Sequence, residues 1–193
     1  FAPGTGISSV YVYSGAESMA ISNGKIIVTG DFDAFNGAST TDIVSINTDG
    51  TQDLTFDAGT GSNTNIAEVI GVANNKILIG GSFTTYNGST SNGVARINAD
   101  GSLDSTFSVG TGPNAGISAL CEAPDGKLYV GGEYITFNGV TISGIIRLNT
   151  DGSRDTSFAP VSGITAHGGG GRQVHSCQIQ SDGKVLLGGY FAG

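Results

Sequence analysis

The chain has 193 residues, of which 33 are glycine, and its 8 basic and 16 acidic residues give a formal net charge of −8. Charged residues make up 12% of the sequence, against about 25% in ordinary soluble domains. The scarcity of lysine and arginine argues against a nucleic-acid partner, and no apolar run reaches the roughly 20 residues that span a bilayer, which argues against membrane insertion.

Short strands joined by tight turns are predicted along the whole chain. The first clear turn is Asn23-Gly24, a two-residue link that favours a β-hairpin because both of its positions need a positive φ. In the next unit, strands are predicted at residues 66–73 and 76–83, and then at 93–98 and 102–107. Turns equivalent to the first one are Asn74-Asn75, Asp125-Gly126 and Asp182-Gly183. Each complete unit therefore supplies four antiparallel strands.

The strand pattern repeats every 51 residues. Lys25, Lys76 and Lys127 keep this step, whereas Lys184 follows after 57, because six residues are inserted around TAHGGGGRQ at 165–173. The approximate units are 1–56, 57–107, 108–158 and an incomplete unit, 159–193. Four antiparallel strands in about fifty residues is the size of a propeller blade. The predicted fold is all-β, a partial β-propeller over residues 1–193 with about 3.5 four-stranded blades.

Such a number of blades cannot close a ring, which normally needs about four to eight of them. A truncated array would also expose an unpaired strand and an apolar blade face at each end. Phe1 aligns with the last residue of a unit, Phe56, and GGYFAG at 188–193 aligns with the middle of one. We therefore expect further repeats of the same parent chain to flank this segment. The alternative is that the sequence itself lacks residues that complete the array.

Two stretches carry a resemblance to a known family. They are DGKLYVGGEY at 125–134 and RLNTDGSRDTSF at 147–158, with Asn138-Gly139 between them. This three-part pattern resembles the delta-60 repeat, a propeller-like repeat of large bacterial surface and secreted proteins, and the resemblance covers the whole chain. The first unit departs from the pattern, with TGDF at 29–32 and Ser45 in place of the arginine. The resemblance implies the fold but no shared activity.

The stretch RINADGSLDSTF at 96–107 returns at 45–56 and 147–158. We interpret it as a hairpin with a type I turn at Ala99-Asp100, followed by Gly101 in the left-handed conformation of a bulge. This register pairs Ile97 with Leu103 and places Arg96 opposite Asp104 as an ion pair. The equivalent residues are Gly50 and Gly152 in the turn, Arg147 opposite Asp155, and Ser45 opposite Asp53.

A calcium site is the alternative interpretation of these hairpins. Its ligands would be Asp49, Asp53, Asp100, Asp104, Asp151 and Asp155. Calcium needs about six to eight converging oxygens, whereas each hairpin offers two carboxylates and one amide. The structural interpretation is therefore favoured, and we expect no metal and no cofactor.

Two groups of residues are candidates for binding a partner. Phe35, Tyr86 and Phe137 recur before each Asn-Gly pair, where they either form a platform for glycans or fill the space between blades. His167, Arg172 and His175 surround the glycine-rich insertion, which is either a metal or anion site or a plain surface loop. Outside these groups, Cys121 and Cys177 are interpreted as small buried apolar residues rather than as a disulfide or a metal pair.

No catalytic motif of a hydrolase, metalloprotease or phosphate-binding enzyme is present. We expect a non-enzymatic structural and interaction module of a large extracellular, cell-surface or virion-associated protein, either a surface adhesin or a phage tail fibre. Its expected partners are protein or glycan surfaces and further repeats of the parent chain. One alternative is a glycan-binding, lectin-like propeller. Another is a propeller hydrolase, which would need an exposed pair of acidic residues on one face.

Overall fold

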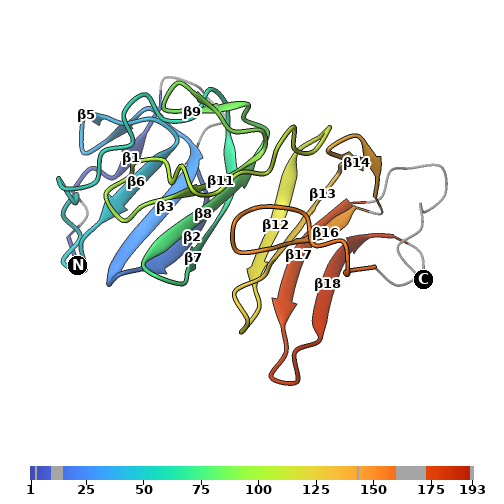
Figure 1. The fold of residues 1–193 in the computed structure, drawn as a ribbon. Coiled ribbons are helices and arrows are strands. Elements are labelled where there is room, and N and C mark those ends of the chain that lie inside the picture. Colours follow the sequence, from blue (N-terminus) through green and yellow to red (C-terminus); the bar gives the residue numbers. More distant parts are fainter. Residues whose placement is uncertain (3, 10–14, 143, 160–172, 192–193) are drawn as a thin grey trace.

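The computed structural model describes residues 1–2, 4–9, 15–142, 144–159 and 173–191. The regular elements in these ranges are β-strands, and none of the described residues belongs to a helix long and apolar enough to cross a membrane. Four main antiparallel sheets stand side by side in chain order, and we call them blades 1 to 4 (Figure 1).

Blades 1 to 3 each contain three antiparallel strands in the order in which the chain forms them. Blade 1 consists of β2 (Gly15–Ser22), β3 (Lys25–Asp31) and β6 (Ile43–Ile46). Blade 2 consists of β7 (Ile66–Val72), β8 (Lys76–Gly81) and β11 (Val94–Ile97). Blade 3 consists of β12 (Ile117–Glu122), β13 (Leu128–Gly132) and β16 (Ile145–Leu148). Blade 4 has two described strands, β17 (Gln173–Ile179) and β18 (Val185–Tyr190).

A small hairpin follows the second strand of blades 1, 2 and 3. The three hairpins are β4 (Ala34–Phe35) with β5 (Ala38–Ser39), β9 (Thr85–Tyr86) with β10 (Ser89–Thr90), and β14 (Thr136–Phe137) with β15 (Val140–Thr141). In the first of them, β1 (Ile7–Ser8) pairs with β4 as a third strand. Asn-Gly pairs form all three turns, and each asparagine there has a φ between 46° and 51°.

The predicted all-β, propeller-like arrangement of antiparallel repeats is confirmed, but the fourth strand of each blade is not. In blade 2 the segment after β11 forms a single β-bridge, between Ile97 and Leu103. Equivalent single bridges join Ile46 to Gln52 and Leu148 to Arg154. The segment leaves the sheet so early because the chain then turns inward at a buried aspartate, which is described below. The described sheets do not close into a ring.

The hydrophobic core lies between neighbouring blades. Ile27 and Ile43 of blade 1 cluster with Val69 and Ile79 of blade 2, and similar clusters lie between blades 2 and 3 and between blades 3 and 4. Blades 2 and 3 approach the blades that follow them closely because their second strands end in two glycines. A Cβ atom on Gly80, for example, would lie 2.7 Å from Cγ2 of Ile117 in the next blade.

Blade 1 departs from the others in two ways. Its first turn has two residues, because Ser22 pairs with Lys25, whereas Val72 pairs with Lys76 across a three-residue turn in blade 2. The first strand of blade 1 is therefore offset by one residue, so that Met19, which faces Val28, takes the position of Val69, which faces Ile79. The second difference is Thr29, which stands in the place of Gly80 and is fully buried.

We predict that Gly80→Ala will destabilise the protein by about 1–3 kcal/mol, because the added methyl group must displace Ile117 of blade 3. Gly15→Ala is the matched control, since Gly15 lies in β2 and a Cβ atom there meets open space. The control should be neutral, or more stable by up to about 1 kcal/mol through its effect on the unfolded chain. Urea unfolding measures both variants. Equal free energies of unfolding for the two would contradict the close packing of blades 2 and 3.

Candidate functional site

The three hairpins at residues 47–51, 98–102 and 149–153 have the same geometry, and we call them the Asp-Gly hairpins. In the second, the amide of Asn98 donates to the carbonyl of Ser102 at 2.8 Å, and the amide of Gly101 donates to the carbonyl of Asn98 at 3.0 Å. Gly101 has a φ of 90°, and its counterparts Gly50 and Gly152 have φ values of 97° and 87°. Each glycine is therefore in the conformation that favours glycine.

Each Asp-Gly hairpin also receives the linker that enters its blade. The amide of Asp57 donates to the carbonyl of Asp100 at 2.7 Å, and a Cβ atom on Gly101 would lie 2.6 Å from the Asp57 carbonyl oxygen. The amides of Ala2 and Ser108 make the same contact with Asp49 and Asp151. The glycine is thus required twice, by its own φ and by the close approach of the linker.

A buried carboxylate follows each Asp-Gly hairpin, and we call each carboxylate with its polar partners a clasp. Asp53, Asp104 and Asp155 are only 5%, 5% and 7% exposed. In blade 2, Oδ1 of Asp104 accepts hydrogen bonds from the amide and the hydroxyl of Thr106, at 3.1 and 2.6 Å. Its Oδ2 faces Nε of Arg96 at 2.8 Å and Nζ of Lys76 at 3.3 Å. The charge of the buried carboxylate is therefore fully compensated.

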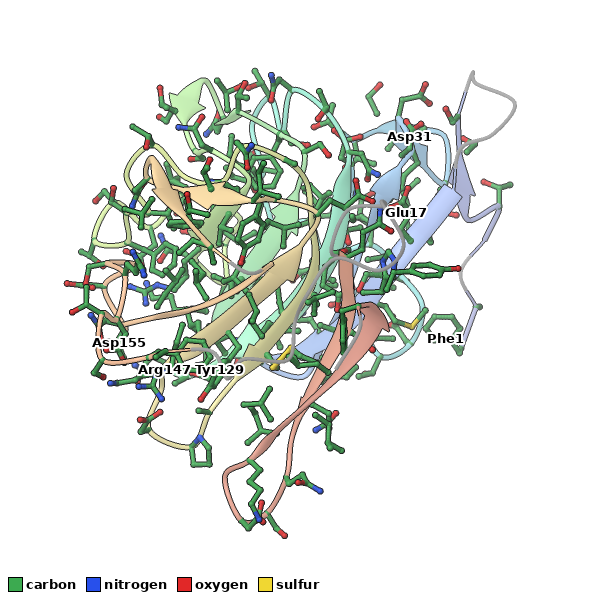
Figure 2. All side chains as sticks on the ribbon, turned by 90° about the vertical axis from the view of Figure 1, so that its right-hand side faces the viewer. Phe1, Glu17, Asp31, Tyr129, Arg147 and Asp155 are labelled. Atoms are coloured by element: carbon green, nitrogen blue, oxygen red, sulfur yellow. A yellow bond between two sulfur atoms is a disulfide. The ribbon has the colours of Figure 1, made fainter. Side chains whose placement is uncertain are left out.

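The clasps of the other two blades differ in their cations. In blade 3, Oδ2 of Asp155 lies 2.7 Å from Nη2 of Arg147 and 2.7 Å from Nζ of Lys127. Arg147 lies beside Asp155 and Tyr129 in Figure 2. In blade 1, Ser45 replaces the arginine and its hydroxyl donates to Oδ2 of Asp53 at 3.2 Å. Lys25 lies 3.4 Å from the same oxygen, so this clasp has one cation instead of two.

The clasp aspartates have lowered pKa values. Burial alone would raise the pKa of Asp104, but the hydrogen bonds from Thr106 and the guanidinium of Arg96 favour the charged carboxylate more strongly. The pKa of Asp155 is lowered first by its hydrogen bond from Lys127 and then by that from Ser157. These carboxylates are therefore ionised at neutral pH and are poor candidates for a general acid.

The sequence prediction missed the lysine of the clasp. Lys25, Lys76 and Lys127 served there only as markers of the repeat. In the structure, Nζ of Lys76 also donates to Oδ1 of Asn98, so that one side chain joins the second strand to the Asp-Gly hairpin. The 51-residue step shared by the lysine, the asparagine and the aspartate was the available signal.

The carboxylates proposed as calcium ligands already accept hydrogen bonds from the chain. Oδ1 of Asp100 accepts from the amide and the hydroxyl of Ser102 at 3.0 and 2.6 Å. Asp49 and Asp151 are held in the same way by Thr51 and Ser153. Among the described residues, no three acidic, histidine or cysteine side chains converge as a metal site would require.

The recurring aromatic residues do not form a glycan platform. Phe35, Tyr86 and Phe137 are 1%, 0% and 0% exposed, so no sugar ring can stack on them. The Tyr86 hydroxyl donates to the carbonyl of Gly101 at 2.8 Å, which joins the small hairpin of β9 and β10 to the Asp-Gly hairpin. The glycan interpretation of these rings is therefore wrong, because each ring is enclosed in a hydrophobic core cluster.

Of the three residues around the glycine-rich insertion, only His175 is among the described residues; His167 and Arg172 lie outside them. His175 is exposed on β17, where its ring contacts Tyr190 edge to face, with a centroid distance of 5.8 Å. Its Nε2 lies 3.1 Å from Oε1 of Gln173. No acidic residue or cysteine joins His175 in a metal-binding cluster among the described residues.

The two cysteines form a disulfide, contrary to the prediction that they are separate apolar residues. Cys121 on β12 and Cys177 on β17 are bonded, with a Cα–Cα distance of 6.0 Å (yellow bond in Figure 2). The bond joins the first strands of blades 3 and 4. The repeat concealed this pairing, because the two cysteines do not occupy equivalent positions. Cys121 corresponds to Gln178 in blade 4, and Cys177 lies one residue before it.

Polar grooves run between neighbouring blades on the side of the clasps. The groove between blades 2 and 3 holds a cavity of about 390 Å³, whose lining includes Lys76, Arg96, Asp104 and Glu122. The equivalent groove between blades 1 and 2 holds a cavity of about 210 Å³. In the wider groove, Nη1 of Arg96 reaches the carbonyl of Thr150 in blade 3 at 2.5 Å. Arg96 of the clasp thus also links blade 2 to blade 3.

Comparison with known proteins supports the propeller fold. The family model "Domain of unknown function (DUF5122) beta-propeller" matches residues 21–56, 73–107 and 123–158. No curated protein matches the chain.

Three solved structures are similar in fold, at low sequence identity. The computationally designed Ika4 protein has a TM-score of 0.53 and 16% identity, and the match covers 96% of both chains. The designed Ika8 protein (TM-score 0.52, 16% identity) is matched over 95% of this chain and 48% of its own length. A catalytically inactive virginiamycin B lyase from Staphylococcus aureus with quinupristin (TM-score 0.50, 17% identity) is matched over 90% and 48%. The chain therefore spans about half the length of Ika8 and of the lyase.

We predict that Asp104→Asn will lower the free energy of unfolding by about 3 kcal/mol at neutral pH, because Lys76 and Arg96 lose the partner of a buried ion pair. The folded-state pKa of Asp104 is depressed, so its contribution is present above the unfolded-state pKa of about 3.9 and is lost as pH falls through the folded-state pKa. The difference between wild type and variant should therefore shrink at acid pH. Urea unfolding at a series of pH values measures it.

The control for this prediction is Asp182→Asn, which removes the exposed pair with Lys184 and should change stability little at any pH. A loss of stability in Asp104→Asn that is small, or that stays constant down to acid pH, would contradict a charged and buried clasp.

A second prediction concerns Tyr86. Replacing it with alanine should lower the free energy of unfolding by about 3–5 kcal/mol, because a fully buried ring is removed from the core between blades 1 and 2. Replacing it with phenylalanine should cost only about 1 kcal/mol, the loss of the hydrogen bond to Gly101. An unchanged melting temperature in the alanine variant would show that the Tyr86 ring is not part of the core, and it would restore the glycan interpretation.

Proposed function

We propose that this chain, which belongs to the DUF5122 β-propeller family, is a non-enzymatic structural and interaction module of a larger extracellular or virion-associated protein. The family description assigns no activity, so the proposal rests on the surfaces that the blades present. Each complete repeat unit would form one blade of a longer array, of which about 3.5 blades are present here.

The observation that carries the proposal is the apolar face of blade 1. Met19 and Ile21, on β2, are 69% and 68% exposed. Val69 and Leu120 occupy the position of Met19 in blades 2 and 3, and they are 1% and 4% exposed because the preceding blade covers them. The face of blade 1 thus has the composition of a blade interface without a covering blade. A neighbouring blade of the same parent chain is the surface that fits it.

Blade 4, at the other end of the described chain, also exposes an apolar residue whose counterparts in blades 2 and 3 are buried. Leu186 pairs with Gln178 there and is 53% exposed. Its counterparts, Leu78 in blade 2 and Tyr129 in blade 3, are 0% and 6% exposed. Two uncovered blades at opposite ends of a rigid stack suit an internal module of a longer assembly.

The disulfide between Cys121 and Cys177 supports the extracellular location. Disulfides persist in secreted proteins, on cell surfaces and on virions, whereas the cytosol keeps most thiols reduced. A surface adhesin and a phage tail fibre both fit this location. The partners of the module would be protein or glycan surfaces, together with further repeats of the parent chain.

We predict that the purified chain self-associates through its uncovered blade faces and that Met19→Ser combined with Ile21→Ser weakens this association at least about tenfold. Sedimentation velocity over a range of concentrations measures the association. Leu54→Ser is the matched control, because Leu54 is 87% exposed but lies on the segment after an Asp-Gly hairpin and not on β2. A wild-type chain that stays monomeric and binds no apolar dye would contradict the proposal.

A further inference from the structure

The cavity between blades 1 and 2 occupies the place where blade 2 holds its arginine. Its volume of about 210 Å³ is several times the roughly 30 Å³ that one water molecule takes up in the liquid. Lys25, Ser45, Asp53, Thr55 and Ala99 are among its lining residues. We call it the Ser45 cavity.

The next groove shows how a guanidinium group is held at this place. Nε of Arg96 donates to Oδ2 of Asp104 at 2.8 Å. Its Nη2 donates to Oγ1 of Thr106 at 3.3 Å, and its Nη1 donates to the carbonyl of Thr150 at 2.5 Å. A carboxylate, a hydroxyl and a carbonyl thus accept from three nitrogens of one planar group, and the ring of Phe107 lies 4.8 Å from its central carbon.

The Ser45 cavity keeps these acceptors but lacks the guanidinium. One repeat earlier, Asp53 stands for Asp104, Thr55 for Thr106 and Ala99 for Thr150, and all three line the cavity. Asp53 is only 5% exposed, so its carboxylate forms a buried part of the site. Ser45 stands where blade 2 has Arg96, and its hydroxyl donates to Oδ2 of Asp53 at 3.2 Å.

The charges around the cavity also leave room for one cation. Lys25, Asp53 and Asp100 line it, which gives one positive and two negative groups. Lys25 leaves space for a second cation at Asp53. Its counterpart in blade 2, Lys76, contacts Oδ2 of Asp104 at the same time as Arg96 does. A planar guanidinium matches a set of acceptors spread around its edge better than a compact ammonium group does.

We propose that the Ser45 cavity binds one guanidinium group supplied by a separate molecule. The source is either a small guanidinium compound or the arginine side chain of a partner protein. The site goes beyond the module role proposed above and does not depend on it, since it lies between two blades that are both described here.

The first experiment titrates the ¹⁵N-labelled chain with ethylguanidinium chloride, below denaturing concentrations, at constant ionic strength. We expect saturable shifts of the amide resonances of Ser45, Thr55 and Ala99. Ethylammonium chloride should bind at least about tenfold more weakly, because it lacks the planar fork. Equal binding of the two ions, or the absence of saturable shifts, would overturn the proposal.

Variants then locate the site. Ser45→Arg supplies the chain's own guanidinium and should reduce ethylguanidinium binding at least about tenfold. Ser45→Ala is the matched control, which removes the hydroxyl, keeps the cavity and should retain binding. Arg96→Ser reproduces the cavity in blade 2 and should raise the stoichiometry from one site to two. Unchanged binding in a folded Ser45→Arg variant, or no added site in Arg96→Ser, would each assign the shifts to another surface.

A last comparison distinguishes the two sources. The blocked peptide acetyl-Gly-Arg-Gly-amide carries the same group on a backbone. Binding of this peptide at least as tight as that of ethylguanidinium would support an arginine of a partner protein as the ligand. Binding of ethylguanidinium without binding of the peptide would support a small guanidinium compound.

Discussion

The blades depend on a carboxylate that is buried at the end of each repeat. An ionised aspartate that leaves water must find both cations and hydrogen-bond donors within the protein. Asp104 finds them in Lys76 on the second strand, in Arg96 on the third strand and in Thr106 on the segment after the hairpin. One charge therefore fixes three segments of a blade relative to one another. Because losing one partner costs far more than the intact pair contributes, the clasp specifies the arrangement more than it stabilises it.

The same constraint explains why blades 1 to 3 have three strands each. The chain needs an Asp-Gly hairpin after the third strand in order to return the aspartate to Arg96, and this return allows only one β-bridge, between Ile97 and Leu103. The turn then receives the linker of its own blade through the bond from Asp57 to Asp100. Arg96 adds a contact with the next blade at Thr150. Hydrogen bonds at the hairpins and apolar side chains between the sheets thus hold the stack together.

The 51-residue period of the sequence was sufficient to predict the features that every unit shares. It was not sufficient to predict contacts between blades. The register of the Asp-Gly hairpin follows from local turn chemistry, and the structure places Arg96 beside Asp104, as that register requires. Whether Tyr86 lies in the core or on the surface depends on how blades stack, which no local pattern reports. The disulfide from Cys121 to Cys177 joins non-equivalent positions of two neighbouring first strands, so the 51-residue period does not report it. The packing of neighbouring blades therefore determines both the burial of Tyr86 and the pairing of the cysteines.

Blade 1 differs from blades 2 and 3 at two positions where neighbouring blades meet, Thr29 and Ser45. Thr29 replaces a glycine against which the next blade packs elsewhere, and it is buried without a hydrogen-bond partner for its hydroxyl among the described residues. Ser45 replaces an arginine but leaves the acceptors of that arginine in place. The first change alters packing, whereas the second removes a cation and keeps its binding site. An array in which every blade must hold the same buried carboxylate can thus acquire a ligand site by shortening one side chain, because the clasp and the next blade already supply the rest.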